Sequence, residues 1–175
     1  METKKMLMIS LSIAILFTQE QLLMFLPNIQ LTVLLIIVFT SVYTFKESII
    51  LITAYVLLDS LFMGGFNIFY MVPMLLAWYL IPISYHTFLR KTNNELKLGL
   101  FALLFGFVYG WMFIPFNMLQ TGINNFLPYL IADIPFELIM ATTGFLTVFW
   151  LYKPLYDVLN ELVSVNNLEI AKSFK

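Results

Sequence analysis

Apolar segments, most of them of membrane-crossing length, follow one another from Met6 to Tyr152, with only short polar or turn-forming stretches between them. A membrane helix needs roughly 20 mainly apolar residues to cross about 30 Å of hydrocarbon. Hydrophobic residues make up 61% of the 175 residues and charged residues 11%, whereas an ordinary soluble domain is roughly 45–50% apolar. The excess apolar surface has to face lipid, so the sequence predicts an all-α membrane protein.

Turn-forming and charged residues divide this apolar sequence into six predicted helices. The interruptions include Pro27, the pair Gly64 and Gly65, and a polar segment over 90–95, all typical of helix ends and loops. The second and third apolar stretches are short for a complete crossing. Because no part of the chain forms a polar half, we expect a single domain over residues 1–175. The helices are predicted at about 6–26, 31–45, 48–63, 67–88, 96–118 and 129–152, followed by a short amphipathic tail.

The positive charges are sorted along the chain in a way that tests this number of helices. Lys and Arg near helix ends are retained on the cytoplasmic side of a membrane. With six crossings, one side receives both chain ends and the loops at 46–47 and 90–97, whereas five or seven crossings would distribute the cations over both sides. We therefore expect a single bundle of six transmembrane helices with the N- and C-termini in the cytoplasm. That side carries all nine basic residues: Lys4, Lys5, Lys46, Arg90, Lys91, Lys97, Lys153, Lys172 and Lys175.

Four acidic residues are left near the outer ends of the predicted helices without a basic partner: Glu20, Asp59, Asp133 and Glu137. A central Asp in a membrane helix costs roughly 2.5–3.5 kcal/mol on insertion scales, so such groups normally face the bundle interior or a wet cavity. Asp133 and Glu137 are spaced i,i+4 and repel each other on one helical face. Either one of them is protonated, or water or a cationic or donor-rich ligand lies between them.

Plainer interpretations stay open for two of these acids. Asp133 would cap the sixth helix, because an acid favours a helix N-terminus, and Asp59 would be solvated at the membrane surface. Glu20 and Glu137 lie nearer the hydrocarbon, and for these two residues we favour a position in a cavity.

Amide and aromatic side chains accumulate on the same predicted side as the four acids. A few polar groups in an aromatic-lined concavity are the usual composition of a small-molecule site. Trp78 lies about ten residues inside the fourth predicted helix, which is too deep for the interfacial belt to which we assign Tyr129 and Tyr152. The candidate substrate-binding residues are Glu20, Asn67, Trp78, Trp111, Asn117, Gln120, Asn124, Asp133 and Glu137.

The motifs of common enzyme classes are missing from the sequence. It contains no G-x-x-x-x-G-K-[ST] phosphate loop, no H-E-x-x-H zinc motif and no G-x-S-x-G nucleophile elbow. Cysteine is absent and His86 is the single histidine, which makes a structural zinc site untenable. We expect no enzyme, no catalytic residues, no metal and no cofactor. The chain is also short for a self-sufficient secondary transporter, which indicates a subunit.

Three features, taken in order along the chain, carry a family resemblance. Ser10 and Ala14 form a small-x-x-x-small pattern, which lets two membrane helices approach closely. Residues 25–32 read Phe-Leu-Pro-Asn-Ile-Gln-Leu-Thr, and residues 132–139 read Ala-Asp-Ile-Pro-Phe-Glu-Leu-Ile ahead of Tyr-Lys-Pro-Leu at 152–155. In their order and spacing these segments resemble the substrate-binding S components of energy-coupling factor (ECF) vitamin transporters.

The resemblance implies a six-helix protein of the bacterial cell membrane that captures a vitamin or vitamin precursor from outside the cell. It also implies association with a transmembrane coupling subunit and two cytoplasmic ATPases, through which the ligand is delivered inward. Ser10 and Ala14 would contact the coupling subunit, although the family usually has alanine where Ser10 stands. The ligand would lie at the outer ends of helices four to six. No nucleic-acid partner is expected.

Two other classes of protein, and several ligands, remain as alternatives. A structural membrane protein of cell-wall assembly resembling the rod-shape protein MreD has a similar size and number of crossings. A small intramembrane enzyme would depend on Glu20 or Asp59. For an S component, unpaired carboxylates and aromatic walls favour a ring-containing, donor-rich or cationic ligand, such as a pyridoxine-like compound or a pyrimidine-type precursor. Cobalamin and riboflavin stay open as well.

Overall fold

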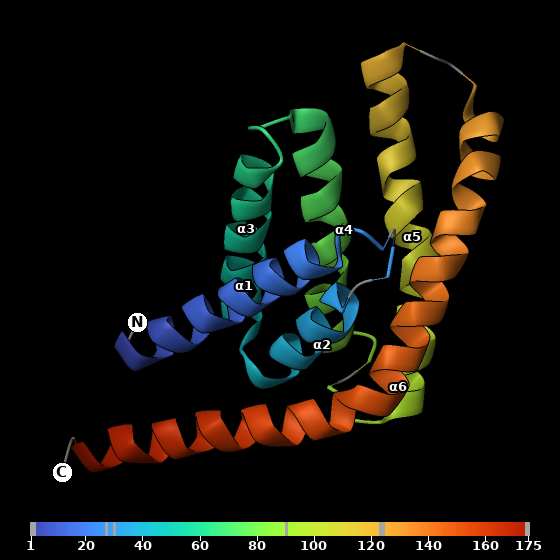
Figure 1. Cartoon of the computed structure of the whole chain (residues 1–175). Coiled ribbons are helices and arrows are strands. Elements are labelled where there is room, and N and C mark those ends of the chain that lie inside the picture. The colour runs from blue at the N-terminus through green and yellow to red at the C-terminus, as the bar shows by residue number, and fades with distance from the viewer. Residues whose placement is uncertain (1–2, 27, 30, 90, 123–124, 174–175) are drawn as a thin grey trace.

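A computed structural model of the chain describes residues 3–26, 28–29, 31–89, 91–122 and 125–173, with the backbone only from residue 165. Within these ranges the regular structure is entirely helical, as predicted (Figure 1). The helix bounds lie within a few residues of the predicted ones, except at the C-terminal end of the last helix. The helices are α1 (Thr3–Leu23), α2 (Thr32–Val42), α3 (Phe45–Phe62), α4 (Ile68–His86), α5 (Glu95–Thr121) and α6 (Phe126–Ser173).

Four of these helices are long and apolar enough to cross a membrane. Among the described residues they are α1, α4, α5 and the part of α6 up to Ser164. Of the other two, α2 is short and α3 carries both Lys46 and Asp59. Large apolar side chains such as Leu104 and Trp150 are exposed on the surface of the long helices. The helices thus confirm the predicted membrane-embedded character of the chain.

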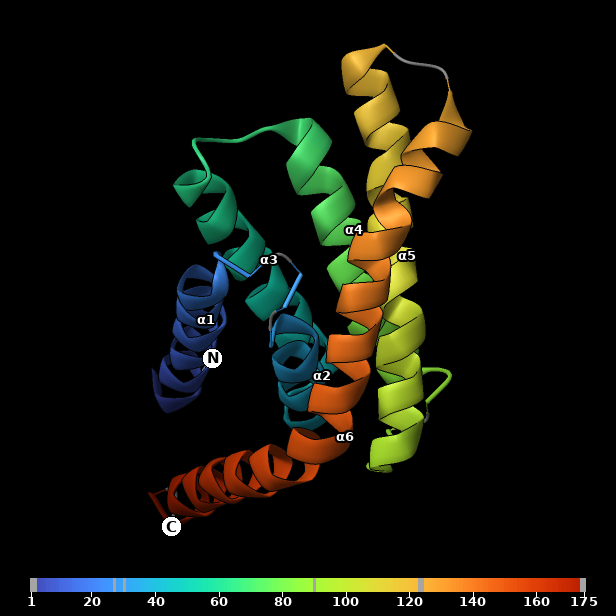
Figure 2. The ribbon, with the colours of Figure 1, turned by 45° about the vertical axis from the view of Figure 1, so that its right-hand side comes forward.

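The helix α2 lies inside the molecule and covers only part of the membrane depth. At about 1.5 Å per residue, its 11 residues span about 16 Å, roughly half of the hydrocarbon thickness. Its residues from Thr32 to Thr40 are buried, as expected of a helix that is apolar all round. The helices α1, α3, α4 and α6 pack around it. Figures 1 and 2 show the α1–α2 turn at mid-height, below the α3–α4 and α5–α6 turns.

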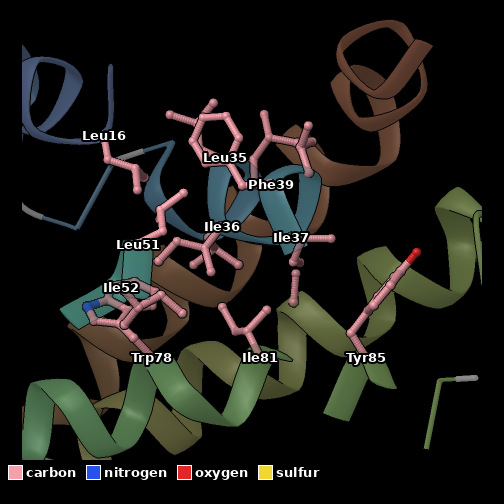
Figure 3. Close-up of a cluster of buried hydrophobic side chains, with 14 of the residues drawn as sticks. Leu16, Leu35, Ile36, Ile37, Phe39, Leu51, Ile52, Trp78, Ile81 and Tyr85 are labelled. Carbon is pink, nitrogen blue, oxygen red and sulfur yellow. The ribbon is translucent and has the colours of Figure 1, made fainter. Parts of the chain in front are cut away.

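The core of the molecule forms where α2 meets its neighbours. Leu16 of α1, Ile36 of α2 and Leu51 of α3 are almost completely buried. Trp78 and Ile81 reach the same cluster from α4, as Figure 3 shows. Because lipid tails are as apolar as these side chains, close packing rather than removal from water stabilises the cluster. This packing holds the α1–α2 turn at its depth.

Polar contacts join several chain segments at one end of the molecule, which we call the basic end. Lys5 Nζ and Glu47 Oε1 form an ion pair at 2.5 Å, and Glu47 also accepts the backbone N–H of Thr44 at 2.9 Å. The hydroxyl of Tyr152 donates to Asn93 Oδ1 at 2.9 Å. The basic end thus comprises the start of α1, the α2–α3 turn, the α4–α5 loop and the middle of α6. Its described cations are Lys4, Lys5, Lys46, Lys91, Lys97 and Lys153.

The helix α6 continues past the predicted end of the last transmembrane helix. Tyr152 and Pro154 both lie inside it, and Figures 1 and 2 show its red C-terminal part turned away from the direction of the orange part. A proline inside a helix removes a backbone hydrogen bond and favours a kink. Tyr152 is 0% exposed. Its assignment to the interfacial belt is therefore wrong, because its ring is packed in the core and its hydroxyl is bonded to Asn93.

The helices α5 and α6 approach each other closely at two glycines of α5. A Cβ atom at Gly106 would lie 2.5 Å from the Cα of Ala141, and one at Gly110 would lie 2.6 Å from Oε1 of Glu137. The two glycines are spaced i,i+4, so they share one face of α5. Small residues in this spacing let membrane helices pack closely, and here they admit the backbone of α6 and one of its acids.

Replacing Gly106 by alanine is expected to lower the stability of this helix pair. The new methyl group would overlap backbone atoms of Ala141, which costs about 1–3 kcal/mol. Gly144→Ala is the matched control, because its Cβ would meet the Ala102 carbonyl oxygen at 3.4 Å, an ordinary contact. Both changes gain about 1 kcal/mol in helix propensity. Thermal unfolding in detergent micelles should show a lower midpoint for Gly106→Ala than for Gly144→Ala, and equal midpoints would contradict the tight packing.

Candidate functional site

A cavity of about 620 Å³ lies between the α1–α2 turn and the parts of α3, α4, α5 and α6 that are remote from the basic end. Small-molecule sites commonly have volumes of roughly 300–1,000 Å³. Because the α1–α2 turn stops at mid-height in Figures 1 and 2, the cavity occupies the half of the molecule opposite the basic end. Its polar and aromatic lining residues are Glu20, Gln21, Asn28, Asp59, Tyr70, Tyr109, Phe113, Asn117, Asp133, Phe136 and Glu137.

The charged groups that line the cavity are all acidic. The four acids that the sequence analysis selected, Glu20, Asp59, Asp133 and Glu137, are brought together here from α1, α3 and α6. No Lys, Arg or His stands among the described residues of the lining. A site of one sign of charge with low-dielectric walls concentrates ligands of the opposite sign. The cavity is therefore suited to a positively charged ligand and unsuited to an anion.

Glu20 and Asp59 form the acidic part of the wall made by α1 and α3. Tyr55, one turn before Asp59 on α3, donates its hydroxyl to Glu20 Oε2, and the Tyr70 hydroxyl lies within bonding reach of Asp59. Asp59 is only 2% exposed, so its interpretation as a solvated group at the membrane surface is wrong. Its Oδ2 atom has no hydrogen-bond partner among the described residues.

Glu137 and Asp133 form the acidic part of the opposite wall, on α6. Glu137 is 3% exposed, and its Oε2 accepts the indole N–H of Trp111 at 3.2 Å. Its Oε1 has no partner among the described residues. Asp133 lies about two turns inside α6, which begins at Phe126, so the interpretation of Asp133 as a helix cap is wrong. Trp111 reaches the cavity through Glu137 and does not line it.

Trp78 supports the cavity wall from behind. Its side chain is 0% exposed, and its ring centroid lies 4.7 Å from that of Tyr109 and 5.4 Å from that of Phe105. Tyr109 does line the cavity, and its ring is followed at 5.1 Å by that of Phe113. The sequence analysis placed Trp78 in contact with the ligand, whereas the structure places it one layer behind the wall.

Only some of the amide side chains that were predicted to bind the ligand lie at the cavity. Asn117 lines the cavity. Asn67 caps α4 instead, because its Oδ1 accepts the backbone N–H of Phe69 at 2.9 Å, which is the usual role of asparagine at a helix start. Gln120 is exposed at the end of α5, away from the lining. Asn124 lies outside the described residues.

Several residues of the site were missed by the sequence analysis, although the sequence contains signals for them. Gly106 and Gly110 repeat the small-x-x-x-small pattern that was noticed only in α1. Tyr109 lies at i,i+4 from both Phe105 and Phe113, so the three rings share one face of α5. A glycine pair and an aromatic stripe on one helix, read together, would have indicated a closely packed helix beside a ring-lined wall.

Ser10 and Ala14, predicted to contact a coupling subunit, are both exposed on α1. The Ser10 hydroxyl donates to the carbonyl of Met6 in its own helix at 2.9 Å. Its hydrogen is therefore already bonded within α1. Leu7 and Leu11 are exposed on the same side of the helix. This face of α1 is therefore apolar, contains small residues, and is not covered by the part of the chain that the structure describes.

The acids of the cavity are not arranged for a metal ion. Among the described residues, no group of three or more His, Cys, Asp or Glu side chains is placed to hold one. A divalent cation normally needs several protein oxygen ligands around one point. The four acids are instead distributed over three helices of the lining, with two of them on α6. Their arrangement suits an extended organic ligand better than a compact ion.

No protein-family model, curated protein or solved structure matches the chain. The two sequence segments that carry the resemblance to S components both contribute to the cavity wall. Residues Leu26, Asn28 and Ile29 come from the first segment, and Asp133 and Glu137 come from the second.

Neutral substitutions at the two buried acids are expected to stabilise the ligand-free protein. Asp59→Asn and Glu137→Gln keep the shape of the side chain and remove a buried charge with an unpartnered oxygen, which should add about 1–3 kcal/mol of stability. Glu161→Gln, at an exposed position of α6, is the matched control and should leave stability nearly unchanged. Thermal unfolding of ligand-free protein in detergent measures the effect. Lower midpoints for both buried variants would show that the carboxylates are well satisfied without a ligand.

Proposed function

We propose that the chain is the substrate-binding S component of an ECF-type importer in a bacterial cell membrane. It captures a vitamin or vitamin precursor from outside the cell and delivers it through a shared coupling module. The observation that carries the proposal is that Asp59 and Glu137 are buried beside the cavity, each with one oxygen that has no hydrogen-bond partner in the described part of the chain. A buried carboxylate in this state is costly, and a bound donor ligand offsets the cost.

The proposed orientation places the basic end in the cytoplasm and the cavity on the outer side. Lys and Arg are retained on the cytoplasmic side, and the described cations gather at the basic end. Both termini are then cytoplasmic, and the six helices form a bundle in which α2 enters the membrane part of the way. The α1–α2 turn becomes the floor of a cavity that is supplied from outside.

The proposed partners supply the energy for transport. The sequence has no phosphate-binding loop, so ATP hydrolysis has to come from two cytoplasmic ATPases that act through a transmembrane coupling subunit. Ser10 and Ala14 lie on an exposed apolar face of α1, and small residues on such a face let another membrane helix approach closely. We assign this face to the coupling subunit.

Cysteine labelling tests the orientation directly, because the chain has no cysteine of its own. Gln120→Cys, at the exposed end of α5, should react with a membrane-impermeant maleimide in intact cells. Lys91→Cys, at the basic end, should react only after the membrane is permeabilised. The reverse pattern would place the cavity on the cytoplasmic side and exclude capture from outside.

Tryptophan substitutions on α1 test the proposed subunit contact. Ser10→Trp and Ala14→Trp should prevent co-purification with the coupling subunit and its ATPases, because the larger ring keeps a partner helix at a distance. Binding of the co-purifying ligand, identified by mass spectrometry, should be unchanged, since both positions are remote from the cavity lining. Leu104→Trp, at a 64% exposed position of α5, is the control and should keep both properties.

Two results together would exclude the proposal: the purified protein contains and binds no vitamin or precursor, and it does not associate with a coupling module. A structural protein of cell-wall assembly, the alternative class, predicts this combination. Such a protein would also keep its effect on cell shape when Glu137 is replaced by glutamine, because a ligand site is not part of its role.

A further inference from the structure

The four acids of the cavity form two pairs that belong to different walls. Glu20 of α1 and Asp59 of α3 lie within electrostatic reach of each other, where α1 packs against α3. Asp133 and Glu137 face each other one turn apart on α6, which packs chiefly against α5. Figures 1 and 2 both show α4 between α3 and α6. The negative charge of the cavity is thus concentrated at two separate places.

Each pair contains one deeply buried carboxylate with an oxygen atom that accepts no hydrogen bond from the described residues. Asp59 is 2% exposed and Glu137 is 3% exposed, and both line the cavity. Asp59 Oδ2 and Glu137 Oε1 have no hydrogen-bond partner among the described residues. The other oxygen of Glu137 is already occupied by the Trp111 indole. A buried charged acceptor is costly when it is left unpaired. Each wall therefore contains one carboxylate that a hydrogen-bond donor of a ligand would stabilise.

Aromatic rings form the part of the cavity wall between the two pairs. Tyr70 of α4 and Phe113 of α5 lie 5.7 Å apart between ring centroids, and Tyr109 lies 5.1 Å from Phe113. All three side chains line the cavity. Such rings pack well against an apolar or aromatic body, and their faces also attract a neighbouring cation. The middle of the ligand is therefore expected to be apolar or aromatic.

A ligand with a single positive centre would pair with the buried carboxylate of only one of the two walls. The opposite buried carboxylate would remain without a partner, at the full cost of an unpaired charge. A bare metal ion fails for the same reason, and the described acids are not grouped to coordinate one. Two positive centres can pair with both carboxylates at once when the body between them is as long as the distance between the two walls.

We propose that the cavity binds an organic dication, with one cationic nitrogen centre at Asp59, the other at Glu137, and an apolar or aromatic body between them. Each centre is a protonated amine, an amidine or a charged ring nitrogen, which can pair with the carboxylate of a residue that lines the cavity. Glu20 and Asp133 add negative charge beside the two contacts. This inference rests on the proposed function, because it names the class of ligand that the S component captures.

Matched pairs of ligands test the inference on the unaltered protein. The protein is purified in detergent, freed of bound ligand, and titrated by calorimetry with p-xylylenediamine and with p-methylbenzylamine, which has the same ring and one amine fewer. Putrescine and cadaverine are compared in the same way with butylamine and pentylamine. At least one diamine should bind about tenfold or more tightly than its matched monoamine. If no diamine is favoured over its monoamine, the dication proposal is overturned.

Substitutions then test whether both walls take part. Asp59→Asn and Glu137→Gln should each weaken binding of the preferred diamine about tenfold, because each removes one of two charge-assisted contacts. Monoamine binding should change by less than about threefold, since the remaining acid can still be occupied. Glu161→Gln, which is remote from the cavity, should change neither affinity. Loss of diamine binding in only one of the two variants would reduce the site to a single cationic contact and contradict the proposal.

The outcome for the ligand class is separable from the outcome for the proposed function. A neutral or anionic co-purifying ligand, together with intact association with the coupling subunit, would overturn the dication and leave the S-component assignment standing. Absence of that association, together with a clear diamine preference, would overturn the assignment and leave the two-centred cation site standing.

Discussion

The burial of Asp59 and Glu137 without a cation in the cavity lining is the constraint on which the cavity half of the molecule depends. A carboxylate at membrane depth costs several kcal/mol unless it is paired or hydrated, roughly 2.5–3.5 kcal/mol on insertion scales. Among the described residues the donors to these acids are neutral, such as the Trp111 indole for Glu137. Neutral donors stabilise a carboxylate less than a cation does. A cationic ligand would therefore stabilise these carboxylates more than their described neutral partners do.

The space for this site follows from the shortness of α2. At about 16 Å, α2 is roughly half as long as the hydrocarbon layer is thick, and the α1–α2 turn lies below the turns of the longer helices. Asn28 in this turn has a positive φ of 60°, a conformation that asparagine adopts more readily than most residues. The full burial of Thr32–Thr40 fixes the turn at that depth. The longer helices α3 to α6 extend past it, and the space between them is the cavity.

The sequence predicted most of the helices because segment length and hydrophobicity are local properties of the chain. It also predicted Glu137 as a cavity residue, because an acid without a cation in an apolar segment is visible locally. Contacts between helices are not local. Trp78 lies behind the wall because Tyr109 of α5 covers it, and Tyr152 is buried because Asn93, 59 residues earlier, receives its hydroxyl. Such pairings depend on which helices are neighbours, and the helical pattern of one segment does not contain that information.

The buried polar atoms without a hydrogen-bond partner in the described part of the chain differ in charge between the cavity lining and the rest of the molecule. At the basic end, Glu47 has Lys5 and Thr44 as partners. The neutral buried atoms without a partner among the described residues lie outside the cavity lining: Thr40 Oγ1, Ser60 Oγ, Trp78 Nε1 and His86 Nε2. The two carboxylate atoms in that state belong to Asp59 and Glu137, which are both residues of the cavity lining. Since an unpaired buried charge costs more than an unpaired neutral group, the cost is concentrated where a ligand can remove it.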